Sequence, residues 1–144
     1  KGYSNEWITQ RMQTIQARKK LTDEWRERGI ETDKEYAILT SEMTKAGSGK
    51  TVREYKELKG LKKESLRDNM TDIELALNML AEVTTTAISK REQPTSFDES
   101  KKIAKRGGSV AKDARRSVEE QLGESVISPL NASKVEQLTT KKDD

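Results

Sequence analysis

Histidine and cysteine are both absent from the 144 residues of this chain. Their absence excludes a disulfide framework, a thiolate nucleophile, a zinc site built from Cys and His, and a His-based catalytic triad. Aromatic residues make up only 4% of the sequence and hydrophobic residues 31%, so material for a large core is scarce. We therefore expect neither a thick β-sandwich nor a doubly wound α/β core.

Long apolar runs are missing as well. No stretch approaches the roughly 18 apolar residues that a membrane-spanning helix needs, and no basic and apolar leader precedes a small-residue cleavage site. We expect a soluble, cytoplasmic chain without membrane contact, which the lack of cysteine suits. Because the sequence begins at Lys1 rather than Met, we also expect it to be part of a longer polypeptide or a processed product.

Proline occurs only at Pro94 and Pro129, so glycines and helix caps mark most of the predicted helix boundaries. Apolar residues at three- and four-residue steps predict helices over 5–20, 22–29, 33–46, 51–58, 62–69, 71–89 and 97–122. In the first helix, Ile8, Met12 and Ile15 share the face that we expect to turn toward the core.

The clearest helix start is the capping box Thr71-Asp72-Ile73-Glu74. The apolar face that follows consists of Ile73, Ala76, Leu77, Leu80, Val83, Thr84 and Ala87, and we expect it to be buried. The β-branched run 84–86 weakens the last turn, so fraying there is the competing interpretation. A second capping box, Ser96 to Glu99, begins a helix that ends before Gly123.

These patterns predict an all-α protein: a multi-helix bundle with a long amphipathic C-terminal helix and a loose polar tail. We place the helical domain at residues 1–122, with its last helix at 97–122, and a mostly irregular tail at 123–144. The segment from Gly47 to Thr51 ends in Gly-Lys-Thr, as a phosphate-binding loop does. However, Thr44 stands where such a loop needs its first glycine, so we interpret the segment as a helix stop followed by a cap.

One face of the last predicted helix is strongly cationic. Residues 101–116 contribute a charge of +6, while the rest of the chain sums to −3. The candidate nucleic-acid-binding residues on this face are Lys101, Lys102, Lys105, Arg106, Lys112, Arg115 and Arg116. Like charges four residues apart repel each other, and a polyanion along the face would relieve that repulsion. A solvated face, or one covered by an acidic subunit, is the alternative.

The opposite face of the same helix has small residues that we expect to pack against another helix: Ala104, Gly107, Gly108, Ala111 and Ala114. Each glycine inside a helix costs roughly 1 kcal/mol relative to alanine, so two in succession need compensation. Close approach of a helix from this chain or from a second copy would provide it. Alternatively, Gly107-Gly108 breaks the helix in two.

A second group of lysines, Lys59, Lys62 and Lys63, surrounds Gly60-Leu61. Such a turn can hold phosphate or be an ordinary exposed connector. Carboxylate pairs occur mainly in the first turns of predicted helices, where the helix dipole explains them. We therefore expect no enzyme, no metal and no cofactor.

Several short segments follow one another in the order Tyr55-Lys56, Lys59-Gly60-Leu61-Lys62-Lys63, Met70 and Glu74-Leu75-Ala76. With these segments in this order, the chain resembles the C-terminal region of DNA-damage-inducible protein D. It is also similar to the C-terminal part of phage antirepressor-like proteins that carry a BRO N-terminal domain. The resemblance runs from about Trp7 to Leu130, and it continues through Gly107-Gly108-Ser109 to Gly123. It implies a bacterial or prophage protein of the DNA-damage (SOS) response that acts on the RecA recombinase filament on single-stranded DNA. The BRO-like domain, to which DNA binding is usually ascribed, is not in this sequence.

We therefore expect a non-enzymatic regulatory module that contacts nucleic acid, single-stranded DNA above all, or a RecA filament through the basic helix. The alternative is a structural module that forms helical homo-oligomers without touching nucleic acid.

Overall fold

The computed structural model describes residues 4–131 and contains no strand within that range. Its helices are α1 (Asn5–Glu27), α2 (Asp33–Ser48), α3 (Val52–Leu58), α4 (Asp72–Glu92) and α5 (Phe97–Leu122), with one 3-10 turn, η1 (Arg67–Asn69). The prediction of an all-α helical bundle is confirmed.

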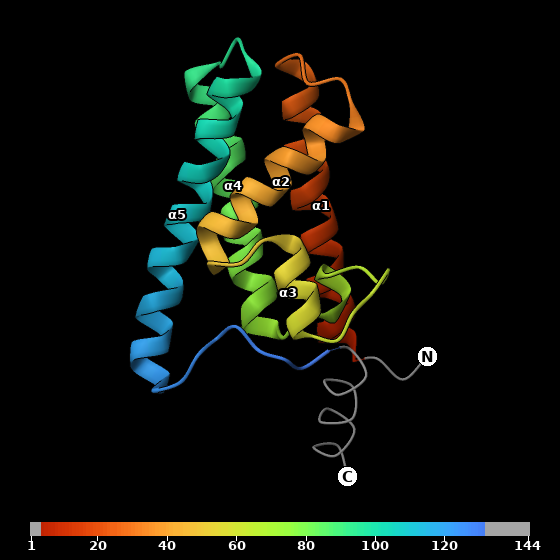
Figure 1. Cartoon of the computed structure of the whole chain (residues 1–144), viewed down its shortest axis with the longest axis vertical. Helices are drawn as coiled ribbons and strands as arrows, with labels where there is room; N and C mark the ends of the chain where they lie inside the picture. Colours follow the sequence, from red (N-terminus) through yellow and green to blue (C-terminus); the bar gives the residue numbers. More distant parts are fainter. Residues whose placement is uncertain (1–3, 132–144) are drawn as a thin grey trace.

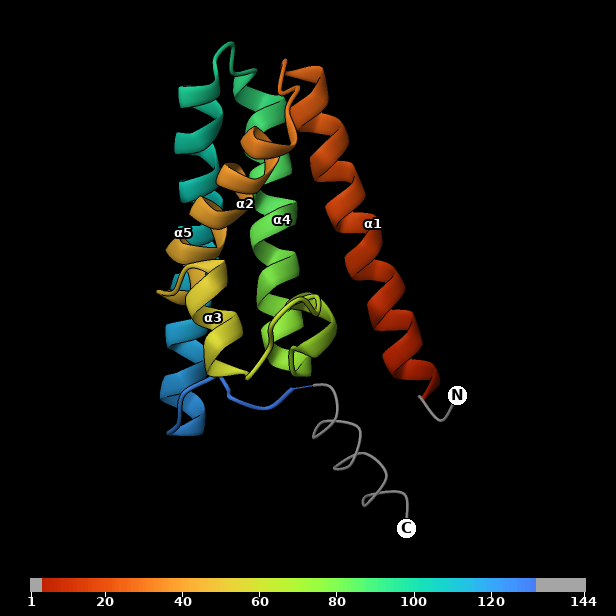
Figure 2. The same cartoon turned by 45° about the vertical axis from the view of Figure 1, so that its right-hand side comes forward.

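Helix α4 is the central element of the bundle. It packs against α5 on one side and against α1 on the other, and Figure 2 shows α4 between the two. Helix α2 packs against both α5 and α4, and the short α3 follows it on the same side (Figure 1). Helix α5 therefore lies at an outer edge of the bundle, with one face inward and the other in solvent.

The core has two parts. The larger lies between α1, α2, α4 and α5, and its buried members are Leu21, Trp25, Ile30, Leu39, Met43, Ala81, Ala104 and Ala111. The smaller lies under α3 and the connection to α4, and its buried members are Tyr55, Leu61, Leu66, Met70 and Leu75.

Side-chain caps begin four of the helices. Thr71 forms the predicted capping box of α4. The predicted cap Thr51 also forms a capping box, at the start of α3, and Thr32 forms another at the start of α2. Ser96 accepts a hydrogen bond from the backbone N–H of Glu99, whose own carboxylate accepts from Thr95 N–H. Each cap satisfies backbone donors that the first helical turn leaves unpaired.

The segment with the Gly-Lys-Thr ending connects two helices. Gly47 lies inside α2, and Gly49 ends that helix with a left-handed φ of 79°, which glycine adopts without strain. Thr51 then begins α3. The interpretation as a helix stop followed by a cap is confirmed.

Helix α1 differs from the prediction in two ways. It runs without a break past Thr22, so the predicted division into two helices is wrong. Its predicted core residues Ile8, Met12 and Ile15 are exposed, because the helix turns a different side, which includes Leu21 and Trp25, toward the bundle.

The segment after α3 and the helix α4 also differ from expectation. Only η1 is helical within the predicted helix 62–69. Helix α4 continues through Thr84–Thr86 to Glu92, so the last turn does not fray before Ser89. Its predicted core face is wrong, because Ile73 and Val83 are exposed. The buried side of α4 consists of Glu74, Leu75, Ala81, Glu82, Thr85, Thr86 and Ser89.

Helix α5 is continuous through Gly107-Gly108, so the alternative of two shorter helices is wrong. A Cβ atom on Gly107 would lie 1.8 Å from Thr85 Oγ1 of α4, and one on Gly108 would lie 2.3 Å from the Met43 carbonyl oxygen of α2. The two glycines therefore let the backbone of α5 approach both neighbours more closely than any other residue would permit.

Between Gly123 and Asn131 the backbone is irregular, as expected, but residues 126–131 are anchored to the bundle. Val126 is buried, the Ser128 N–H donates to Glu74 Oε2, and the Leu130 carbonyl accepts from Lys59 Nζ. This part of the expected loose tail is therefore packed. The remaining residues of the tail, 132–144, lie outside the described range.

We expect Gly108→Ala to lower the free energy of unfolding by about 2 kcal/mol or more, because the new methyl group would collide with backbone atoms of α2. Gly47→Ala is the matched control: its Cβ would lie 3.2 Å from the Gly108 carbonyl oxygen, a milder contact. Urea denaturation of both variants measures the difference. A Gly108→Ala variant as stable as the original protein would contradict the close approach.

Candidate nucleic-acid interface

The cationic residues of α5 lie opposite its buried face. Ser100, Ile103, Ala104, Gly107, Gly108 and Ala111 are buried, and the lysines and arginines between positions 101 and 116 are on the remaining surface. Helix α5 is more sharply divided into an apolar and a charged side than α1, α2 and α4. We call the seven cations at 101, 102, 105, 106, 112, 115 and 116 the basic stripe.

Part of the basic stripe is neutralised by acids of the same chain. Lys101 and Lys105 of α5 share one carboxylate, since the Nζ atom of each lies 3.8 Å from Glu42 Oε1 of α2. Arg106 Nη1 donates to Glu92 Oε1 at 2.8 Å. Exposed pairs of this kind contribute little to stability, and a competing polyanion can replace them at small cost.

Arg115 has a structural role. Its Nε donates to the Gly47 carbonyl at 2.9 Å, its Nη1 donates to Glu119 Oε1 at 3.1 Å, and its side chain is only 15% exposed. Glu119 in turn accepts from the Val126 N–H at 2.9 Å, and this bond holds the pKa of Glu119 below its usual value. Arg115 therefore connects α5 to α2 and to the segment after Gly123.

Three cations of the stripe remain without an ion-pair partner among residues 4–131: Lys102, Lys112 and Arg116. They span about 21 Å of helix at 1.5 Å per residue. The seven cations of the stripe have four carboxylates beside them: Glu42, Glu92, Glu119 and Asp113. The stripe therefore keeps a net excess of three positive charges.

The small residues predicted for helix packing face helices of the same chain. Ala104, Gly107, Gly108 and Ala111 are buried, and Ala114 is half-buried. Their neighbours include Thr85 of α4 and Met43 of α2. This face of α5 is filled inside the bundle, so a second copy cannot dock on it.

Lys59 does not belong to an exposed basic cluster, and its assignment as a nucleic-acid-binding residue is corrected. Its side chain is 0% exposed, and its Nζ donates to Glu74 Oε1 at 2.7 Å and to the Leu130 carbonyl at 2.6 Å. Burial lowers the pKa of Lys59. Lys62 and Lys63 are exposed, but α3 separates their loop from α5 in both views (Figures 1 and 2).

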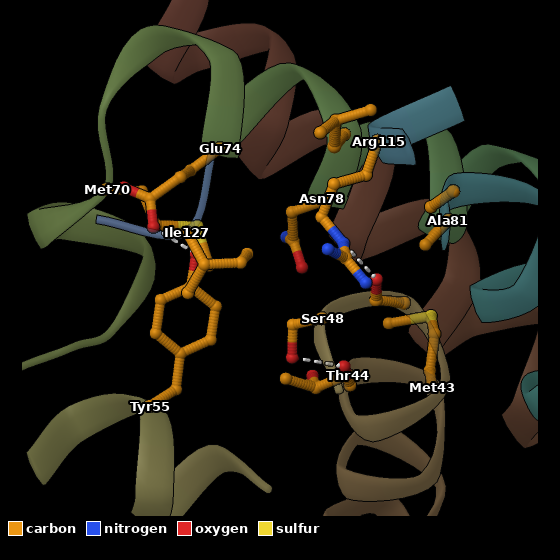
Figure 3. Close-up of a pocket in the computed structure, with 13 residues that line it drawn as sticks. Met43, Thr44, Ser48, Tyr55, Met70, Glu74, Asn78, Ala81, Arg115 and Ile127 are labelled. Carbon is orange, nitrogen blue, oxygen red and sulfur yellow. Dashed lines mark hydrogen bonds between the residues drawn. The ribbon is translucent and has the colours of Figure 1, made fainter. Parts of the chain in front are cut away.

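Glu74 joins Lys59 in a buried cluster that sequence reasoning missed. The Tyr55 hydroxyl donates to Glu74 Oε2, as Figure 3 shows, and the Thr71 and Ser128 backbone N–H groups donate to the same carboxylate. Burial raises the pKa of Tyr55, which therefore stays protonated as a donor. The cluster connects the end of α3, the start of α4 and residues 128–130.

A signal for this cluster was present in the sequence. Tyr55 and Lys59 stand four residues apart and hence on one face of α3. Several landmarks of the family resemblance meet here, since Leu61, Met70 and Leu75 belong to the smaller core beside the ion pair. The adjoining cavity in Figure 3 has a volume of only about 40 Å³, which suits a water molecule rather than a substrate. We interpret these landmarks as structural.

A second buried carboxylate, Glu82, lies in the middle of α4. Its side chain is 1% exposed, and Arg18 Nη1 and Arg67 Nη1 each lie 3.8 Å from its Oε2. Burial raises the pKa of Glu82 to about 7 despite the two guanidinium groups. Removal from water is therefore the dominant influence on this group.

Among residues 4–131, no group of three carboxylates lies close enough together to hold a metal ion. None of the helices in that range has both the length and the apolar composition needed to cross a lipid bilayer.

We expect Lys59→Met to lower the free energy of unfolding by about 3–5 kcal/mol, because it leaves the Glu74 carboxylate buried without its ammonium partner. Lys62→Met, at an exposed position of the same loop, should change it by less than about 0.5 kcal/mol. Urea denaturation distinguishes the two variants. Equal, small effects would show that Lys59 is solvated and would return it to the list of candidate contacts.

Glu82 makes stability depend on pH in a defined direction. Between about pH 4.5 and 7 the folded chain keeps a proton on Glu82 that the unfolded chain has released, so this group's contribution falls as pH rises and is constant above pH 7. The total change is on the order of 3 kcal/mol. Denaturation from pH 4.5 to 8 measures the free energy of unfolding of the original protein and of Glu82→Gln. The value for the original protein minus that for the variant should fall as pH rises across that window. Parallel profiles would contradict the assignment.

Comparison with protein-family models matches residues 4–138 to the DinD C-terminal domain. Comparisons with curated proteins and with solved structures give no match.

Proposed function

The chain belongs to the family of DinD C-terminal domains, and we propose that it is a non-enzymatic regulatory module of a DNA-damage-inducible protein that contacts single-stranded DNA through α5. The observation that carries the proposal is the basic stripe, with its net excess of three charges on one exposed helix face. The family match supports the cellular setting, and the stripe supports the kind of contact.

The basic stripe suits a phosphate backbone rather than individual bases. Contacts from lysine and arginine to phosphates fix position without carrying sequence information. Stacking on bases would need exposed rings. Among the aromatic side chains that the structure describes, Trp25 and Tyr55 are buried and Tyr36 and Phe97 are half-buried. We therefore expect little dependence of affinity on base sequence.

A RecA filament is the partner that the family resemblance implies. Single-stranded DNA is the component of such a filament that a cationic helix face would contact. The ion pairs of Arg106 with Glu92, and of Lys101 and Lys105 with Glu42, lie on the surface and would exchange their carboxylates for phosphates. The exchange adds cations to the contact without rearranging the fold.

The alternative function, assembly through the small-residue face of α5, loses its surface because that face is filled by α2 and α4. An assembly role needs a different surface of the molecule.

The direct test is the affinity for a fluorescent single-stranded oligonucleotide, measured by polarisation at several salt concentrations. With about three phosphates neutralised, log Kd should change with log salt with a slope near 2, a loss of roughly 15-fold between 50 and 200 mM. Lys102→Glu with Arg116→Glu should abolish binding, because the double change reverses the excess charge. No binding of the unaltered chain at 50 mM salt would overturn the proposal.

A matched control distinguishes the effect of the basic stripe on binding from the effect of the chain's net charge. Lys19→Glu with Lys34→Glu changes the net charge equally at exposed positions of α1 and α2, and should weaken binding by less than about threefold. Lys62→Glu with Lys63→Glu tests the loop in the same way. Equal losses for all three pairs would show a general charge effect and no interface on α5.

A further inference from the structure

Helix α4 has a mainly apolar row on its outer side that the described chain leaves largely uncovered. Its apolar members are Ile73, Ala76, Leu80, Val83 and Ala87, and Lys90 continues the same spacing. Ile73 is 39% and Val83 is 51% exposed, while Ala76, Ala87 and Lys90 are exposed and Leu80 is half-buried. Helices α1 and α5 lie on either side of α4 (Figure 2). Single exposed apolar residues are ordinary on protein surfaces, whereas an ordered row of them marks an interface.

The spacing of the row is that of a coiled-coil seam. Its members follow each other at alternating steps of three and four residues over 73–90, so positions 73, 80 and 87 alternate with 76, 83 and 90 as the a and d positions of heptads. A groove of about 600 Å³ between α1 and α4 continues the apolar surface, with Met12, Met79 and Val83 among its lining residues. A second helix laid on the seam would also reach this groove.

Two copies of the seam fit each other when their helices run antiparallel. In an antiparallel pair centred between Ala81 and Glu82, Leu80 faces Val83 of the second copy, and Ala76 faces Ala87. The larger side chains meet at the centre, and the small ones on either side let the two backbones approach. At each end Ile73 meets the aliphatic stem of Lys90, whose ammonium reaches solvent.

The charges at the ends of the seam favour the same direction. Asp72 stands at the N-terminal end, and Lys90 and Arg91 at the C-terminal end. All three are exposed. Antiparallel pairing sets Asp72 beside Lys90 of the second copy, on the same flank of the seam, whereas parallel pairing would set Lys90 against Lys90. Helix dipoles also attract each other in the antiparallel arrangement.

We infer that α4 is a dimerisation helix and that two copies of this chain associate through antiparallel pairing of the 73–90 seam. The seam is about 26 Å long at 1.5 Å per residue, which places the interface at the small end of specific contacts. We therefore expect the dimer to be weak. The inference does not depend on nucleic-acid binding.

Sedimentation equilibrium from about 1 to 500 µM tests the association. The unaltered chain should shift from the mass of one copy toward that of two, whereas Val83→Glu should remain monomeric. Ile15→Glu is the matched control, because Ile15 is also 51% exposed but lies on α1 away from the seam. It should dimerise like the unaltered chain. Circular dichroism checks that both variants fold.

A chain that stays monomeric to 500 µM would overturn the inference and leave this face for a different protein. Equal behaviour of Val83→Glu and Ile15→Glu would overturn it as well, because dimerisation would then not use the seam.

The direction of pairing has its own test, because the natural chain has no cysteine to interfere. Ala76→Cys and Ala87→Cys, mixed and oxidised above the dissociation constant, should give mainly the mixed disulfide by mass spectrometry. Each variant alone should remain unlinked, since like positions would stand about 16 Å apart along the helix axis. Predominant linkage within either single variant would overturn the antiparallel register.

Discussion

The close contact of α5 with α2 and α4 determines most of the architecture. It depends on two adjacent glycines, because Thr85 of α4 and the Met43 carbonyl of α2 occupy the space where side chains would begin. With its backbone fixed there, α5 can turn only one face outward, and that face has the lysines and arginines. The same contact brings Arg115 within hydrogen-bonding distance of Gly47. The tight packing and the exposed charge are thus two consequences of one constraint.

Features set by local chemistry were predictable from the sequence. The caps at Thr51, Thr71 and Ser96 follow from residues three or four positions away, and the full length of α5 follows from its amphipathic pattern. The capping box at Thr32 has the same signature and could have been found. Such features are predictable because both interacting groups lie within one helical turn.

The inward faces of α1 and α4 could not be predicted from apolar periodicity. The bundle buries Glu24 and Glu82, and their arginine partners offset part of the cost of removing carboxylates from water. Periodicity counts such residues as solvent-facing, so the apolar rows that it selected became the outer surface. Lys59 was misjudged for the same reason, since its partner Glu74 lies 15 residues further along the chain.

The anchored segment after α5 changes where the structural unit ends. Lys59 and Glu74 are buried side chains whose hydrogen bonds extend to Leu130 and Ser128, and the Asn131 side chain donates to the Lys59 carbonyl. A fragment cut at Gly123 would keep every helix and still uncover the Lys59 ammonium. Expression boundaries and domain limits for this fold are therefore better placed beyond Asn131 than at the last helical residue.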